Sequence, residues 1–126
     1  MLQKENRLRK MKDFEILMKE GNFVGGDLAN IKVWWVDPDK YPRREYKKKN
    51  LLVGFAVGKK VYKGAVKRNR IKRQMREVVR LLLKDNKMKS GAMVLIIAKG
   101  DIVDAAYEEI EVSIVNTLKK ARLFCD

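Results

Sequence analysis

The sequence predicts one domain of the α+β class that spans residues 1–126 and has the element order αβββαβα. Its 126 residues, 46% of them hydrophobic, are enough for one buried core and too few for two ordinary domains. Apolar residues recur at every second position in some segments and at helical spacing in others, which predicts strands and helices in one chain. We therefore expect helices packed on one face of a small sheet, with the other face open.

The first residues, 1–12, are polar and basic, and we expect this segment to be extended or mobile. Asp13 then stands where the N-cap of a helix belongs, because apolar residues follow it at helical spacing. Gly21 is expected to end this helix as its C′ residue. The pattern thus predicts a short first helix over about 13–21.

Residues 30–36 alternate in the way that predicts a strand with two different faces. One face carries Ile31, Val33 and Trp35, and the opposite face carries Asn30, Lys32 and Trp34. The following loop, 37–50, contains both prolines and several cations. We expect it to be a flexible turn between two strands.

A second strand is predicted over 51–58, and its two faces differ strongly in bulk. Val53, Phe55 and Val57 share one face, whereas the other face carries only Gly54, Ala56 and Gly58. A strand without bulk on one face allows a large partner to approach its backbone. Weak packing is the alternative explanation.

A long basic helix is predicted over about 65–83. Its expected buried stripe comprises Ile71, Met75, Val78 and Leu82. Nearly opposite on the helical wheel lie Asn69, Arg73, Arg76 and Arg80. We therefore expect one side of this helix to be buried and the other to offer guanidinium groups, which suit bidentate contacts with phosphates.

Two further elements complete the predicted fold. Residues 92–98 are nearly all apolar, as expected of a central strand. A last helix is predicted over about 104–123, with acids early and cations late, an order that suits the helix dipole. Its expected core face carries Tyr107, Ile110, Ile114, Leu118 and Ala121.

Charge is concentrated in the middle of the chain. The formal net charge is +14, of which residues 1–50 contribute +5 (13 basic, 8 acidic), residues 51–100 contribute +12 (14 basic, 2 acidic) and residues 101–126 contribute −3 (3 basic, 6 acidic). Residues 59–76 carry nine cations and no acid. A merely solvated face would intersperse acids, so this density predicts a polyanionic partner.

The chain has no histidine and one cysteine, Cys125, which excludes most protein-only hydrolase sites, Cys/His metal sites and internal disulfides. A carboxylate site for Mg²⁺ stays conceivable, with two candidate sets, Asp37 with Asp39, and Glu108, Glu109 and Glu111. Both sets have simpler explanations, as turn residues and as acids near a helix N-terminus. The longest apolar run, 92–98, is too short to span a membrane, so we expect a soluble cytoplasmic protein without a membrane partner.

Two runs at the junction of the bare-faced strand and the basic helix are VGFAVGKK at 53–60 and RNRIKRQMRE at 68–77. Together with NRLR at 6–9, DF at 13–14 and YEE at 107–109, they resemble the signature of the bacterial ribonuclease P protein component. The resemblance extends over essentially the whole chain.

The resemblance implies a small α/β sandwich, like domain 2 of ribosomal protein S5, with a left-handed βαβ crossover around the basic helix. It also implies a non-catalytic protein subunit of ribonuclease P, which assists a catalytic RNA in the endonucleolytic removal of the 5′ leader from precursor tRNA. The subunit would bind the leader and promote metal and substrate binding. The implied partners are the catalytic RNA and precursor tRNA, with no protein partner required, and Mg²⁺ would be held mainly by the RNA.

In the family, the basic motif faces the catalytic RNA near its metal sites. The matching residues are Lys59, Lys60, Arg68, Asn69, Arg70, Lys72, Arg73 and Arg76. Asn69 would donate to a phosphate or hold a metal-bound water, or it would simply bond backbone groups near the start of the helix. We expect no metal to be held by the protein alone.

The resemblance also implies a cleft between the first helix and the open sheet face that holds the single-stranded leader. Phe14 matches an aromatic position that can stack on leader bases. Met18 stands where the family often has a second aromatic residue, which weakens stacking there, although a thioether can pack on a base. On the sheet we expect Trp34, or Trp35 if the register slips by one residue, together with the small residue Ala56.

Three other functions stay open on the sequence alone. Another RNA-binding module, such as a ribosomal or assembly protein, would carry the same charge. A basic amphipathic helix at a membrane surface would have the cations of 68–80, although the core needs its apolar stripe. A metal-dependent protein nuclease is the enzyme alternative, and it would cleave precursor tRNA with magnesium and no RNA subunit.

Overall fold

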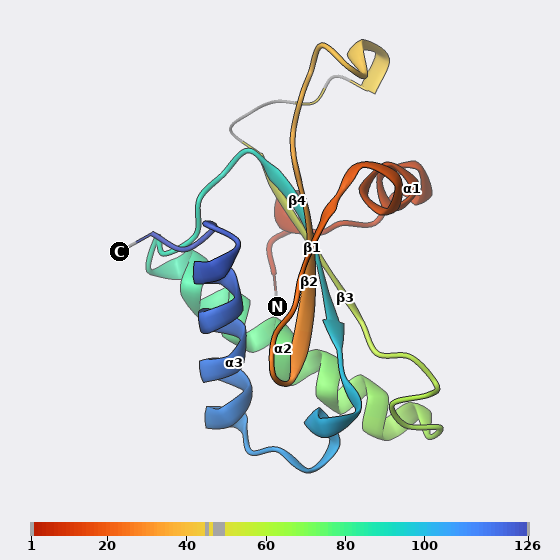
Figure 1. The fold of residues 1–126 in the computed structure, drawn as a ribbon, viewed down its shortest axis with the longest axis vertical. Helices are drawn as coiled ribbons and strands as arrows, with labels where there is room; N and C mark the ends of the chain where they lie inside the picture. The colour runs from red at the N-terminus through yellow and green to blue at the C-terminus, as the bar shows by residue number, and fades with distance from the viewer. Residues whose placement is uncertain (1, 45, 47–49, 126) are drawn as a thin grey trace.

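The computed structural model describes residues 2–44, 46 and 50–125, and it has the predicted α+β architecture (Figure 1). The main elements are α1 (Met11–Glu20), β1 (Asn22–Val24), β2 (Ala29–Trp35), β3 (Leu51–Ala56), α2 (Ala65–Lys84), β4 (Ala92–Ala98) and α3 (Tyr107–Lys120). Short 3-10 helices lie at η1 (Lys4–Asn6), η2 (Pro42–Arg44) and η3 (Gly100–Asp104). The order αβββαβα is confirmed. The sequence pattern does not locate β1, because three residues are too few to show an alternation.

The four strands form one mixed sheet in the order β1-β2-β4-β3. β2 runs antiparallel to β1 and β4, whereas β3 and β4 are parallel neighbours joined through α2. This connection is the βαβ crossover that the family resemblance implies, and its left hand stays a prediction. Figure 1 shows α2 and α3 on one side of the sheet and α1 on the other.

The sheet separates two hydrophobic cores. The larger core lies under α2 and α3 and includes Ile31, Val53, Met75, Ile96 and Ile114. The smaller core lies under α1 and comprises Leu8, Ile16, Leu17, Trp34, Val36, Met93 and Leu95. The face that we expected to be open is therefore partly covered, because α1 buries apolar residues of its own against it.

The first helix begins earlier than predicted and ends differently. Lys10 is its N-cap, and Asp13 lies buried inside the first turn, where Oδ1 accepts a hydrogen bond from the Tyr46 hydroxyl at 2.5 Å. Gly21 follows the helix with a φ of −71°, which is not the left-handed conformation of a C′ glycine. Glycine is needed there because a Cβ would collide with the carbonyl oxygen of Leu17.

The N-terminal segment packs on the sheet and is not free of it. Leu2 and Leu8 are buried. The Leu8 amide donates to the Val53 carbonyl at 3.1 Å, and Arg7 Nε donates to the Leu2 carbonyl at 2.9 Å. We expected residues 1–12 to be extended or mobile; in the described part of this segment, two apolar residues among the cations anchor it along β3.

The remaining elements agree with the predicted ranges to within a few residues. In α2 the fully buried residues are Ile71, Met75, Val78 and Val79. α3 starts three residues late because η3 precedes it. Asp37 Oδ1 accepts a hydrogen bond from the Asp39 amide at 3.1 Å, which confirms a turn there, whereas residues 45 and 47–49 of the same predicted loop lie outside the described residues. Within the described ranges, no helix combines the length and apolarity that a membrane span requires.

Candidate RNA-binding surfaces

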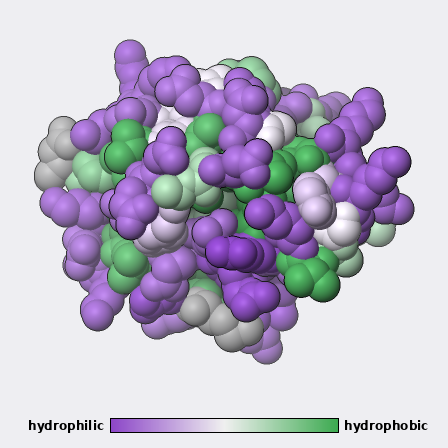
Figure 2. Space-filling model, turned by 90° about the horizontal axis from the view of Figure 1, so that it is seen from below, coloured by the Kyte–Doolittle hydropathy of each residue, from purple (hydrophilic) through white to green (hydrophobic). Residues whose placement is uncertain are grey.

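The predicted RNA-facing residues lie on the turn before α2 and on its N-terminal half. Lys59, Lys60, Asn69, Arg70 and Arg73 are exposed, and Arg68, Lys72 and Arg76 are half-buried. The first turn of α2 has no acidic side chain and no side-chain cap. The positive end of the helix dipole therefore adds to the field of the cations. Seen from below Figure 1, toward this end of α2, the surface is mostly hydrophilic, with hydrophobic side chains in small separate patches (Figure 2).

The arginines along α2 are not equivalent. Arg76 lies over the Phe55 ring at 5.8 Å from its centroid, which orients the guanidinium at the edge of β3. Arg80 donates to both carboxylate oxygens of Glu77, at 2.9 and 2.6 Å. This pair raises the pKa of Arg80 and lowers the pKa of Glu77 through the shared hydrogen bonds. The predicted stripe of guanidinium groups therefore ends at Arg76, since the charge of Arg80 is already compensated.

Asn69 and Arg68 differ in the environment of their side-chain polar atoms. The exposed Asn69 side chain makes no hydrogen bond to backbone groups of the described residues, which argues against the purely local role left open by the sequence. The Arg68 Nε is buried and has no hydrogen-bond partner within the same ranges. Because an unpaired buried donor costs free energy, this arginine favours a bound acceptor at the start of α2.

The residues predicted to line the leader cleft lie on the α1 side of the sheet. Asn30, Ile97 and Ala56 are paired across β2, β4 and β3 and form a half-buried row there. Phe14, half-buried, and Met18, 52% exposed, belong to α1 beside this face. The structure thus brings Phe14, Met18 and Ala56 to one face, as the resemblance implies.

Trp34, not Trp35, lies on this face, as the alternation of the strand predicts, but its side chain is buried there. Its side chain is 6% exposed and packs edge to face on Tyr41 at 5.7 Å and on Tyr46 at 5.6 Å between ring centroids. These rings from the loop after β2 close one end of the α1 face. Trp35, 42% exposed, faces the opposite side, where its register partner Ala92 belongs to the larger core.

The bare face of β3 is partly filled by the chain itself. A Cβ at Gly54 would lie 3.2 Å from Leu8 Cδ2, so the glycine makes room for the N-terminal segment. At Gly58 a Cβ would meet nothing closer than 4.0 Å. The expected close approach of a large partner therefore applies to Ala56 and Gly58, and no longer to Gly54.

A sequence model of the family described as Ribonuclease P matches residues 2–122. The chain belongs to the ribonuclease P family. The ribonuclease P protein component of Clostridium botulinum is 35% identical over 121 residues, which cover 96% of this chain and 98% of that protein. The corresponding protein of Alkaliphilus oremlandii is 36% identical over 118 residues, 94% and 92% of the two chains. The solved RNase P protein of Staphylococcus aureus aligns with a TM-score of 0.77 and 26% identity, covering 96% of this chain and 99% of that one.

For a ribonuclease P family member, one hollow is of particular interest because it joins the two predicted surfaces. It encloses about 300 Å³ at the edge of β3. Phe14 from the cleft and Arg76 from α2 both line it, together with Arg7 and Arg9. The sequence signal for these two N-terminal arginines is the NRLR run at 6–9, which belongs to the family signature.

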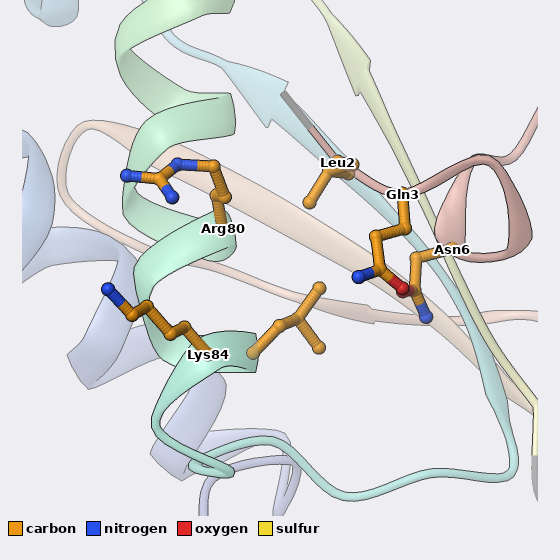
Figure 3. A pocket seen from close by; sticks show the side chains of 6 residues that line it. Leu2, Gln3, Asn6, Arg80 and Lys84 are labelled. Carbon is orange, nitrogen blue, oxygen red and sulfur yellow. The ribbon is translucent and has the colours of Figure 1, made fainter.

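A second hollow, of about 400 Å³, separates the N-terminal segment from the second half of α2. Figure 3 shows the amides of Gln3 and Asn6 side by side, while Arg80 and Lys84 extend from the helix. Asn6 Nδ2 donates to the Leu51 carbonyl at 3.0 Å, which fixes this part of the segment. Sequence reasoning missed this hollow because it treated 1–12 as mobile.

The carboxylates considered for Mg²⁺ do not fit a protein-held metal ion. Among the residues that the structure describes, no three His, Cys, Asp or Glu side chains gather in a way that could hold one. Asp37 forms the turn with Asp39, and Glu109 Oε1 accepts from the Ala106 amide at 2.9 Å, which caps α3. Asp37 and Glu109 therefore have structural roles.

Proposed function

We propose that this chain is the protein subunit of ribonuclease P and assists a catalytic RNA in removing the 5′ leader from precursor tRNA. One observation carries the proposal: the cationic first half of α2 and the aromatic Phe14 of α1 meet at one hollow, which Phe14 and Arg76 both line. A subunit that holds a folded RNA and a single-stranded leader at once needs two such adjoining surfaces. Family membership gives the same answer from the sequence side.

The cationic surface is the proposed contact with the catalytic RNA. Exposed guanidinium groups such as Arg70 and Arg73 can bind phosphates in a bidentate way, and Lys59 and Lys60 add point charges at the preceding turn. Asn69, which is exposed and locally unbonded, can donate to a phosphate or hold a metal-bound water without adding charge. Lys72, Arg68 and Arg76 complete this surface.

The cleft is the proposed contact with the leader. The Phe14 ring can stack on a base, and the thioether of Met18 can pack on a neighbouring base. The small side chain of Ala56 leaves space above the sheet, so that the RNA leader can approach the protein backbone between α1 and β3. Trp34 is not part of this contact, because the loop after β2 covers it.

The reaction itself is assigned to the RNA, with Mg²⁺ held mainly by RNA phosphates. The protein contributes by neutralising phosphates where the catalytic RNA and the substrate meet, which reduces their mutual repulsion. Less magnesium is then needed to bring them together. The proposal includes a cytoplasmic location, precursor tRNA as substrate and no required protein partner.

Reconstitution tests this proposal. The purified chain is added to a bacterial ribonuclease P RNA at a magnesium concentration too low for the RNA alone, and cleavage of precursor tRNA is followed on gels. We expect the chain to restore cleavage, and the chain with magnesium but without RNA to cleave nothing. Cleavage by the chain alone would favour the protein nuclease, and RNA binding without restored cleavage would favour a different RNA-binding module.

A further inference from the structure

An exposed aromatic ring lies at the edge of the sheet, outside every surface predicted from the sequence. Phe23 in β1 is 64% exposed, although it is one of the largest apolar side chains of the molecule. Its register partner is Lys32 in β2, so both side chains point to the α1 side of the sheet. Lys32 Nζ donates to the Met18 carbonyl at 2.8 Å, which places this edge beside the end of α1.

The Phe23 ring lies next to the row that forms the floor of the cleft. Both side chains lie close to Gly25: a Cβ on this glycine would be 3.8 Å from Phe23 Cε1 and 3.9 Å from Asn30 Oδ1. Asn30 is the β2 member of the row that ends at Ala56 in β3. Three strand spacings separate the two edges, about 14 Å in total. The floor of the cleft therefore continues across the sheet to an exposed aromatic ring.

Lysines from distant parts of the chain surround this edge. Lys99 Nζ donates to the Gly26 carbonyl at 3.0 Å, and Lys120 Nζ donates to the Gly25 carbonyl at 2.9 Å. Two cations therefore lie at the turn between β1 and β2, and Lys32 lies opposite Phe23 in the strand register. Asp27 of the same turn lines a hollow with Glu108 and Glu109 of α3.

The edge strand β1 has only three residues, and a very short edge offers little for pairing with another strand, which argues against a second copy of the chain as the occupant. An exposed ring among cations suits single-stranded nucleic acid, whose bases stack on the ring while phosphates meet the lysines. We propose that Phe23, with Lys32, Lys99 and Lys120, forms an additional subsite for single-stranded RNA, which binds the distal part of a leader after it crosses the cleft. This inference rests on the proposed function.

Leader length separates this subsite from the cleft. The assay measures the Kd of the reconstituted RNA–protein holoenzyme for precursor tRNA with a two-nucleotide or a ten-nucleotide leader, by fluorescence anisotropy. For Phe23→Ala we expect affinity for the long leader to fall about fivefold or more, as for the loss of one stacked base, and affinity for the short leader to stay unchanged. Phe23→Tyr keeps the ring and should keep the affinity. Val112→Ala, at another exposed apolar side chain, is the matched control.

Equal losses with both leaders, or no loss with either, would overturn the subsite. A loss in Phe23→Tyr as large as in Phe23→Ala would also overturn it, because stacking would not be the cause. Arg73→Ala in the same assay separates this failure from a failure of the proposed function. If Arg73→Ala weakens holoenzyme assembly and Phe23→Ala has no effect, the subsite alone is wrong, whereas no effect of either contradicts both.

Discussion

Tyr46 determines where the cleft ends. Its hydroxyl donates to Asp13 in α1, and its ring packs on Trp34. Trp34, an aromatic residue that could have faced a ligand, is thereby part of the smaller core. The alternation of β2 places Trp34 on the correct face, but no local pattern indicates that a loop ten residues later covers it.

Phe14 is the residue whose role in leader binding can be tested most directly. If its ring stacks on a leader base, Phe14→Ala should lower affinity for precursor tRNA by about 1–3 kcal/mol and leave mature tRNA nearly unaffected. Equilibrium binding to the holoenzyme measures both. Met11→Ala, at an exposed residue of the same helix, is the control. Equal losses for the two RNAs would mean that Phe14 only supports the fold.

Tyr107 carries a buried hydroxyl without a hydrogen-bond partner in the described part of the chain. Tyr107→Phe removes this unpaired group and should raise the free energy of unfolding by about 1 kcal/mol at neutral pH. Burial also raises the pKa of Tyr107 above its ordinary value of 10.0. Above that pH the unfolded chain loses the proton before the folded protein does, so stability falls as pH rises.

Urea unfolding at pH 7 and at alkaline pH checks both expectations. The Tyr107→Phe protein should be the more stable one, and its stability should decline less above pH 10 than that of the unchanged protein. A less stable variant would show that the hydroxyl has a favourable partner.

At the level of elements, the first half of α2 has exposed cations that are unpaired within the described ranges, and the second half has a cation that is paired with an acid. Arg73 is exposed in the first half, whereas Arg80 is bonded to Glu77 in the second. A helical wheel does not distinguish these two arginines, because it shows the direction in which a side chain points and not whether that side chain is paired with an acid. The pair becomes visible only when side-chain positions are known.

Salt dependence distinguishes these two arginines. A surface that neutralises about six phosphates should give a log–log slope of roughly −4 to −5 for RNA affinity against salt. Arg73→Ala should weaken binding and make the slope less negative by nearly one unit, and Arg76→Ala should act in the same direction. Arg80→Ala, the matched control, should change the slope less. Identical slopes for all variants would remove this helix from the RNA contact.

The elements with long periodic patterns were the ones that the sequence predicted well. α2 and β4 have regular apolar spacing, so their ranges follow from it. The short β1, the buried Asp13 and the conformation of Gly21 depend on tertiary neighbours instead. The same limit applies to the sites: the α2 cations are adjacent in sequence, whereas Lys99 and Lys120 come to the carbonyls of Gly26 and Gly25 only through the tertiary fold.

At the level of the whole molecule, the N-terminal segment fastens the edge of β3. Leu8 fills the space above Gly54, so Leu8→Ala should lower the free energy of unfolding by about 2–5 kcal/mol. Urea denaturation measures this. Arg9→Ala changes an exposed neighbour and should leave stability nearly unchanged. An unaltered midpoint for Leu8→Ala would show that the segment is detached in solution.

The division of the interior into two cores has a consequence for local opening. β4 is hydrogen-bonded on both sides, to β2 and β3, and α2 and α3 share the larger core. Among the described residues, α1 packs on the smaller core and is bonded by the side chains of Tyr46 and Lys32. We therefore expect amide hydrogens of α1 to exchange through partial unfolding at a lower free energy than those of β4. The wall of the proposed cleft could then open to admit an RNA strand while the cationic half of the molecule stays folded.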